Sequence, residues 1–249
     1  MKESYNYKKK WQEHYAEHPY TKTEMSERRD ISAKEFTNLM MENFKTSGIL
    51  DLIKKEKVSM LVSSVNTGER DWEVLRQLDN YLGELKEFHR PSVTLTDFAL
   101  TEEEIKSIIQ KPEKKYKNLD ARIVACDSYH LPFRENEFQI LYERLGALWH
   151  AADEDMQKHG EGALVRNLLE EYKRVVKPGG KIIFDWVSGH RVMPPATAQM
   201  IRRAVKEEVK KFLTNLGFEF EITGTVEDTG IVEDEMSIIL TNPDKKPKK

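Results

Sequence analysis

Hydrophobic residues follow two spacings in this chain. Short runs rich in β-branched residues, typical of buried strands, lie at 121–127, 138–142 and 181–187. Between the second and third runs, apolar residues three or four positions apart over 164–176 indicate a helix with one apolar face. The Lys-Pro-Gly-Gly sequence at 177–180 ends that helix, because proline cannot continue it and glycine accepts a left-handed turn. This part of the chain therefore predicts the order strand, strand, helix, strand.

The same two spacings continue on both sides of this segment. A capping box, Thr101 with Glu104, marks the start of one further helix. The other predicted elements are a helix over 71–85, a strand over 91–97, a helix over 198–216 and strands over 218–222 and 235–240. Strands that alternate with helices predict an α/β domain.

The central motifs resemble those of a known family. Asp127 followed by Leu-Pro-Phe at 131–133, and then Tyr-Lys-Arg-Val-Val-Lys-Pro-Gly-Gly-Lys-Ile-Ile-Phe at 172–184, are similar to class I S-adenosylmethionine-dependent methyltransferases, especially the branch acting mostly on small molecules. The resemblance covers roughly residues 58–241 in element order, and its sharp motifs lie between 121 and 187. It implies a Rossmann-like, doubly wound seven-stranded sheet in the order 3-2-1-4-5-7-6, with the last strand antiparallel.

The resemblance also divides the chain into three parts. Residues 1–57 correspond to an N-terminal helical cap, with helices expected over 6–17 and 31–56 and a break in the second at Ser47-Gly48. Five aromatic residues within the first 20 positions either cover a ligand or pack these helices on the domain. Residues 58–241 are the methyltransferase-like domain, and 242–249 are expected to be a disordered basic tail.

Cofactor-binding positions follow from the resemblance. Asp97 has the place of the acid that holds the two ribose hydroxyls, a role suited to a carboxylate because it offers two acceptor oxygens. Asp127 has the place of the carboxylate that accepts from the adenine amino group, with Ser128 beside it. Phe98 and Tyr142 lie at further positions expected to contact the cofactor.

The glycine-rich loop departs from the family pattern. The resemblance places this loop directly after a first strand that begins near Val58. The family's acid falls on Val62, its first two glycines fall on Ser64 and Asn66, and only the third, Gly68, is retained. Ser64, Asn66 and Gly68 remain the expected cofactor-binding positions, although side chains at 64 and 66 take space that glycines leave open.

No pair of acid and base residues stands out as catalytic machinery. Tyr142, Glu143 and His150 lie at or just beyond the end of the fourth strand, where open α/β sheets bind ligands, and are the candidate catalytic residues. Methyl transfer requires little acid-base chemistry, because a sulfonium is already a good leaving group. His14 and His18 lack a third ligand, so no metal site is expected.

Composition agrees with one globular domain and an appendage. Of 249 residues, 39% are hydrophobic and 33% are charged, and no apolar run approaches the roughly 20 residues of a membrane helix. We expect a cytoplasmic protein with no membrane partner. A formal net charge of −3 argues against a nucleic-acid partner and favours a small-molecule substrate. Cys126, the single cysteine, is interpreted as a buried apolar residue.

Three functions compete at this stage. The sequence favours an enzyme that transfers a methyl group from S-adenosylmethionine to an O, N or C nucleophile of a small molecule. The altered loop leaves open a non-catalytic descendant of the fold that acts as a binding or assembly subunit. A nicotinamide-dependent oxidoreductase is disfavoured, because the Gly-x-Gly-x-x-Gly sequence is absent and a terminal strand pair is present. The sequence does not indicate an oligomeric state.

Overall fold

The structure is a computed structural model. It describes residues 33–63, 69–97, 103, 105, 116–144, 147–148, 151, 163–186, 210–223 and 236–243. Several predicted features lie outside these residues: the helix over 6–17 with His14 and His18, the loop positions Ser64, Asn66 and Gly68, and also Phe98 and His150. No helix in the described ranges is long and apolar enough to cross a membrane.

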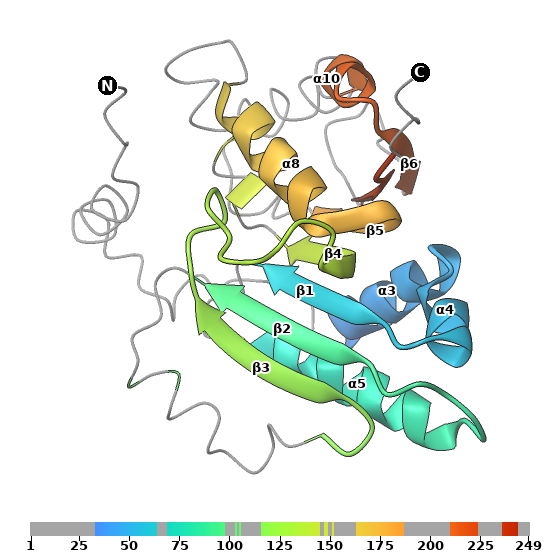
Figure 1. Cartoon of the computed structure of the whole chain (residues 1–249). Coiled ribbons are helices and arrows are strands. Elements are labelled where there is room, and N and C mark those ends of the chain that lie inside the picture. The colour runs from blue at the N-terminus through green and yellow to red at the C-terminus, as the bar shows by residue number, and fades with distance from the viewer. Residues whose placement is uncertain are drawn as a thin grey trace.

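One seven-stranded sheet organises the described chain, and its order is β3-β2-β1-β4-β5-β7-β6 (Figure 1). The strands are β1 (Ser59–Ser63), β2 (Ser92–Asp97), β3 (Asp120–Ala125), β4 (Phe138–Arg144), β5 (Val176–Trp186), β6 (Glu219–Thr223) and β7 (Met236–Thr241). The pairs among β1 to β5 are parallel, whereas β7 is antiparallel to both β5 and β6. The predicted strand order and the reversed last strand are confirmed.

The sheet changes direction between β1 and β4. The chain first builds outward from β1 to β2 and β3, and then returns to place β4 on the other side of β1. Ser63, the last residue of β1, is the register partner of Thr96 on β2 and of Glu143 on β4. Open α/β sheets bind ligands in the crevice outside the carboxyl ends of the strands at such a switch point.

Helices cover both faces of the sheet. Figure 1 shows α3 (Ala33–Thr46) and α5 (Glu69–Glu84) on one face and α8 (Ala163–Val175) on the other. Strand side chains alternate between the two faces, so Met60 and Val62 of β1 join the core that holds α3 and α5, while Leu61 joins the core under α8. The two cores are separate because the sheet lies between them.

The second helix of the expected cap shares a core with the sheet. It is broken at Gly48 (φ 79°) into α3 and α4 (Ile49–Lys55), as the sequence indicated. Phe44 and Ile53 are buried in the same cluster as β1 and α5. α10 (Lys210–Asn215) is the described end of the helix predicted over 198–216.

The turn between α8 and β5 agrees with the prediction in part, because α8 ends just before Lys177 and Gly179 takes a left-handed conformation (φ 74°), whereas the strand begins earlier than expected. α8 ends at Val175, and β5 already begins at Val176, so the Lys-Pro-Gly-Gly sequence lies in the strand. The pairing of β5 with β4 shifts register between Val176 and Lys181, and the side chain of Asn242 donates to the carbonyl of Val176 (2.6 Å) at this irregularity. The backbone of Asn242 also accepts from Gly179 (2.8 Å) and donates to Gly180 (2.9 Å).

Asn242 therefore belongs to the folded domain. It is buried and hydrogen-bonded, although the sequence placed the start of a disordered tail at this residue. A buried carboxamide needs hydrogen-bond partners. The amide nitrogen of Asn242 donates to the carbonyls of Lys173, Val176 and Lys177, whereas its Oδ1 has no partner among the described residues. The described domain extends to residue 243.

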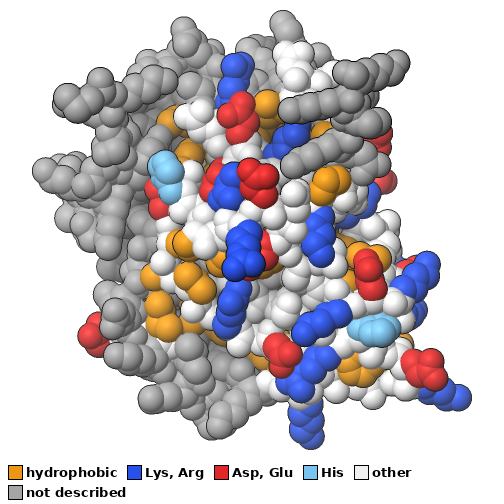
Figure 2. Space-filling model, viewed as in Figure 1, with side chains coloured by type: hydrophobic (Ala, Val, Ile, Leu, Met, Phe, Trp, Pro, Cys, Tyr) orange, Lys and Arg blue, Asp and Glu red, His pale blue; other side chains and the backbone are white. Residues whose placement is uncertain are grey.

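The edge strand β3 is lined by ion pairs. Figure 2 shows basic and acidic side chains interspersed on one face of the molecule. Arg90 pairs with Asp120 at 2.9 Å, and Arg122 lies 3.5 Å from Glu137 while donating to Thr94 at 2.8 Å. Charged side chains on an edge strand discourage pairing with another chain.

Candidate functional site

The carboxyl ends of β2 and β3 present two acids side by side. Asp97 is the last residue of β2 and is 7% exposed, and Asp127 follows β3 by two residues. The Cys126 amide donates to the Asp97 carbonyl at 3.2 Å, so the chain after β3 lies against the end of β2. The structure thus brings together the two acids that the sequence singled out.

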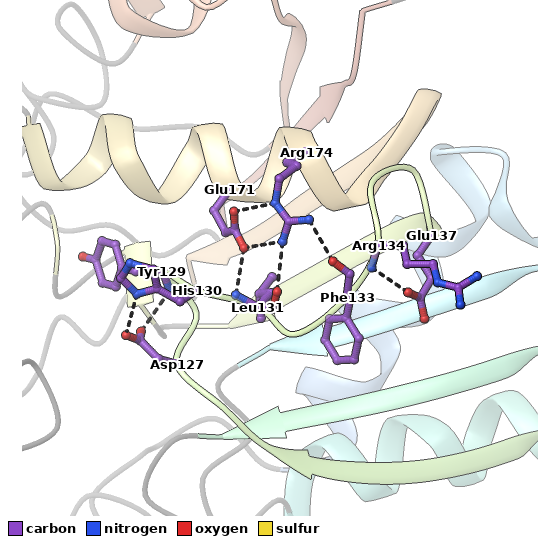
Figure 3. A network of polar contacts seen from close by, with 9 residues as sticks. All are labelled: Asp127, Tyr129, His130, Leu131, Phe133, Arg134, Glu137, Glu171 and Arg174. Carbon is purple, nitrogen blue, oxygen red and sulfur yellow. Dashed lines mark hydrogen bonds and ion pairs between the residues drawn. The ribbon is translucent and has the colours of Figure 1, made fainter. Parts of the chain in front are cut away.

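Asp127 starts a tight turn. Its Oδ1 accepts the amide of Tyr129 at 2.9 Å, and its Oδ2 lies 3.2 Å from Nδ1 of His130 (Figure 3). A carboxylate has about four acceptor positions on two oxygens, so these contacts leave room for another donor. Cys126, expected to be buried within a strand, is half-buried and follows the end of β3, but burial still raises the pKa of its thiol to about 12, which disfavours the reactive thiolate.

Helix α8 holds the loop that follows Asp127. Arg174 donates to the carbonyls of Leu131 (2.9 Å) and Phe133 (2.8 Å), and Glu171 accepts the amide of Leu131 (2.8 Å), as Figure 3 shows. Arg174 and Glu171 also bond to each other in a two-pronged pair at 2.6 and 2.7 Å. The Leu-Pro-Phe segment therefore has a fixed shape without a helix of its own.

A chain of hydroxyls leads from this half-buried loop to the buried Glu143. Ser128 Oγ lies 3.0 Å from Ser63 Oγ, which in turn lies 3.0 Å from the hydroxyl of Tyr172. Tyr172 donates to one carboxylate oxygen of Glu143, and the amide of Leu148 donates to the other at 2.6 Å. Side chains from β1, α8, β4 and the loop after β3 meet here, at the carboxyl ends of the strands.

The electrostatics of this cluster follow from its burial. Glu143 is 1% exposed, and burial raises its pKa to about 7, against the opposing effect of the hydrogen bonds from Tyr172 and Leu148. Burial and the nearby Glu143 carboxylate raise the pKa of Tyr172 well above its usual value, so the phenol stays protonated and donates. Glu143 therefore changes charge near neutral pH.

Tyr142 lies on the opposite face of β4 from Glu143. It is buried in the core with α3 and α5, and its ring meets that of Phe44 edge to face at 6.3 Å between centroids. Val62 is in the same core and is 3% exposed. An acid at position 62, as the family has, would be surrounded here by apolar side chains.

Sequence reasoning did not identify two members of the hydroxyl chain. Tyr172 fitted the apolar face of its helix, and nothing in that spacing shows that its hydroxyl meets a carboxylate. Ser63 lies beside the altered glycine-rich loop and was passed over because the family pattern assigns it no role. Both become recognisable only when residues up to 109 positions apart are brought together. Among the described residues, no group of three His, Cys, Asp or Glu side chains is placed to hold a metal ion.

Comparison with known proteins identifies the fold. No protein-family model and no curated protein matches the chain. The structure is similar to the CurJ carbon methyltransferase (TM-score 0.56, 14% identity) and to the DszA carbon methyltransferase (TM-score 0.55, 12% identity). It is also similar to the PH0226 protein of Pyrococcus horikoshii OT3 (TM-score 0.51, 15% identity).

These likenesses differ in coverage. The match takes in 87% of this chain but 56% of CurJ, and 86% of this chain but 54% of DszA. With PH0226 it covers 93% of this chain and 99% of the other. Together with the strand order, they show that the chain has the class I methyltransferase fold.

Proposed function

We propose that the protein transfers a methyl group from S-adenosylmethionine to an oxygen, nitrogen or carbon nucleophile of a small molecule. The observation that carries this proposal is the pair of acids, Asp97 and Asp127, at adjacent strand ends beside the switch point of a methyltransferase fold. Their chemistry fits the cofactor, because a vicinal diol and an amino group are both donors and the carboxylates are acceptors.

Each residue of the site has a proposed role. Asp97 holds the ribose hydroxyls, and Asp127 accepts from the adenine amino group while Ser128 lines the same loop. Glu171 and Arg174 act through that loop by keeping its backbone in place. Tyr142 supports the floor of the site from the other side of β4. Ser64, Asn66, Gly68 and Phe98 are proposed to complete the cofactor contacts.

The main task of the protein in methyl transfer is to align the nucleophile with the methyl group. S-adenosylmethionine supplies an activated methyl group on a sulfonium, a good leaving group. The protein then has to place the nucleophile in line with the methyl group and exclude water. Two similar structures are carbon methyltransferases by name, but the chain spans little more than half of each, so the atom methylated here stays open among O, N and C.

A non-catalytic binding or assembly subunit is the second candidate. The observation that favours it is the buried, apolar Val62, which replaces the acid of the family's glycine-rich loop. The protein would then keep the fold and lose the cofactor.

Calorimetric titration separates the two candidates. The methyltransferase proposal expects saturable binding of S-adenosylmethionine and S-adenosylhomocysteine with one site per chain. NAD serves as a control nucleotide that should not bind. Absence of binding by both sulfur compounds in folded protein would favour the non-catalytic subunit.

A further inference from the structure

The switch point of the sheet holds an acid that the methyltransferase pattern does not explain. Glu143 on β4 and Ser63 on β1 are register partners at the carboxyl ends of the two strands that flank the switch point. Both side chains bond to the hydroxyl of Tyr172 from α8. A carboxylate therefore lies buried directly beneath the crevice in which this fold binds ligands.

Among the described residues, the surroundings of Glu143 contain little to balance a negative charge. β1 presents Ser63, α8 presents the phenol of Tyr172, and the segment after β4 presents the amide of Leu148. On β5 the register partner is Phe184, whose ring stacks on Tyr172 at 6.1 Å. Among the side chains that the structure describes, no lysine, arginine or histidine pairs with Glu143. An ionised carboxylate in such a place gains strongly from a positively charged ligand.

We propose that Glu143 makes the site selective for a positively charged ligand, so that S-adenosylmethionine displaces a proton from Glu143 on binding and is held in preference to S-adenosylhomocysteine. This inference rests on the proposed function and names how that site distinguishes its two ligands. The sulfur of S-adenosylmethionine carries a positive charge, and that of S-adenosylhomocysteine does not. The two compounds otherwise share the same adenosine and amino-acid groups.

The hydroxyl chain gives the proton a route. Glu143 is fully buried, but Ser128, at the other end of the chain through Tyr172 and Ser63, is only half-buried. When a cationic ligand binds, the proton of Glu143 passes to solvent. When the sulfur loses its charge on methyl transfer, Glu143 takes a proton back from solvent. The loss of attraction then favours release of the product.

The sign of the pH dependence follows from the ligand-free state. Because the pKa of Glu143 is raised to about 7, its carboxyl is protonated below neutral pH and has to lose the proton before it can attract a cation. Affinity for S-adenosylmethionine should therefore rise with pH and level off once Glu143 is ionised. The ratio of the two affinities isolates this effect, since both ligands carry the same amino and carboxyl groups. A drop of one pKa unit on binding gives about a fivefold rise of that ratio between pH 6 and 8.

The test is calorimetry with both ligands at pH 6, 7 and 8, in two buffers of different ionisation enthalpy. We expect the affinity ratio to rise with pH, and at pH 7 more protons to be released with S-adenosylmethionine than with S-adenosylhomocysteine. Glu143→Gln, which has the same shape and cannot ionise, should make the ratio independent of pH. Tyr172→Phe removes a hydrogen bond that favours the ionised carboxylate of Glu143. It should therefore move the midpoint of the pH dependence of the affinity ratio to higher pH.

Each outcome bears on a different claim. Equal proton release for both ligands in the unaltered protein, or a pH-dependent ratio that persists in Glu143→Gln, would overturn the inference and leave the proposed function intact. Should Glu143→Gln fail to fold, the number of protons that the unaltered protein releases on binding each ligand still tests the inference. If neither ligand binds at any of the three pH values, the proposed function itself fails.

Discussion

Asp97 is the residue on which cofactor binding most depends in this account. It is nearly buried at the end of β2, so hydrogen bonds from ribose hydroxyls to its carboxylate would be shielded from water. Asp97→Ala should weaken binding of S-adenosylhomocysteine about 10- to 100-fold, equivalent to about 1.5–3 kcal/mol for hydrogen bonds to a charged group. Titration calorimetry measures this directly.

The matched control is Asp51→Ala. Asp51 is an exposed acid on α4, with its side chain 70% exposed and paired only with Lys54 of the same helix turn in the described contacts. This change should leave affinity within about twofold, because surface pairs contribute little. An unchanged affinity in a folded Asp97→Ala protein would remove Asp97 from the site.

Glu143 should also make the free energy of unfolding depend on pH. Burial raises its pKa in the folded protein to about 7, whereas the unfolded chain has the ordinary value near 4.5. The folded state therefore holds the proton between these values, and this group lowers the free energy of unfolding as pH rises from about 5 to 7. Across this pH range, Glu143 should lower the free energy of unfolding by about 3 kcal/mol.

Urea unfolding of the unaltered protein and Glu143→Gln at pH 5, 6, 7 and 8 checks this. The difference in stability between the two proteins should shift in favour of the variant as pH rises, because glutamine does not ionise. A difference that stays constant across the four pH values would contradict the raised pKa of Glu143.

Helix α8 holds the loop at 127–134, which is proposed to contact the cofactor. Arg174→Met removes the donors to the carbonyls of Leu131 and Phe133. It also removes the positive charge that pairs with Glu171. We expect faster hydrogen exchange at the amides of 129–134 and about tenfold weaker S-adenosylhomocysteine binding, in line with about 1–2 kcal/mol of lost positioning. The rest of the sheet should exchange as before.

Arg76→Met provides the matched control for that experiment. Arg76 forms a similar two-pronged pair with Glu73, three residues earlier on α5, and in the described contacts Arg76 donates to no loop carbonyl. Its loss should change neither the exchange at 129–134 nor ligand affinity. Equal effects of the two substitutions would show that Arg174 has no special relation to the loop.

The turn from α8 into β5 depends on Gly180. A Cβ there would lie 2.6 Å from the carbonyl oxygen of Gln139 and 2.8 Å from that of Lys177, both backbone atoms that cannot move aside easily. Gly180→Ala should therefore destabilise the protein by roughly 2–4 kcal/mol. Gly48→Ala is the comparison, since its site has space but a positive φ, and should cost about 1 kcal/mol.

Chemical denaturation of both variants measures the two effects. We expect Gly180→Ala to be destabilised more than Gly48→Ala. A smaller effect at Gly180 than at Gly48 would mean that the strand after α8 is looser than the structure shows.

Most elements were predictable because each depends on local spacing. The buried strands, the helix over 164–176 and the break at Gly48 follow from hydrophobic period and glycine. The early start of β5 was not predictable from local spacing, and the carboxamide that bonds to Val176 there belongs to Asn242, 66 positions away in sequence. Ser63, Tyr172 and Glu143 were equally hidden as a group, because only tertiary structure brings their polar atoms together.

At the scale of the molecule, the sheet order places the functional groups. The reversal between β1 and β4 collects the ends of β2, β3 and β4 at one edge. In strand order, Asp127 after β3 and Asp97 on β2 lie on one side of β1, and Glu143 on β4 lies on the other. The sequence predicted this order and pointed to all three acids. The burial of Glu143 and its hydrogen bond from Tyr172 came from the structure alone.

The central claim is that S-adenosine compounds bind at this edge through Asp97 and Asp127. A crystal structure of the protein with S-adenosylhomocysteine tests it most directly. We predict that the ribose hydroxyls lie within hydrogen-bond distance of Asp97 and that the adenine amino group faces Asp127. A ligand bound elsewhere, or bound here without contact to either acid, would contradict the account.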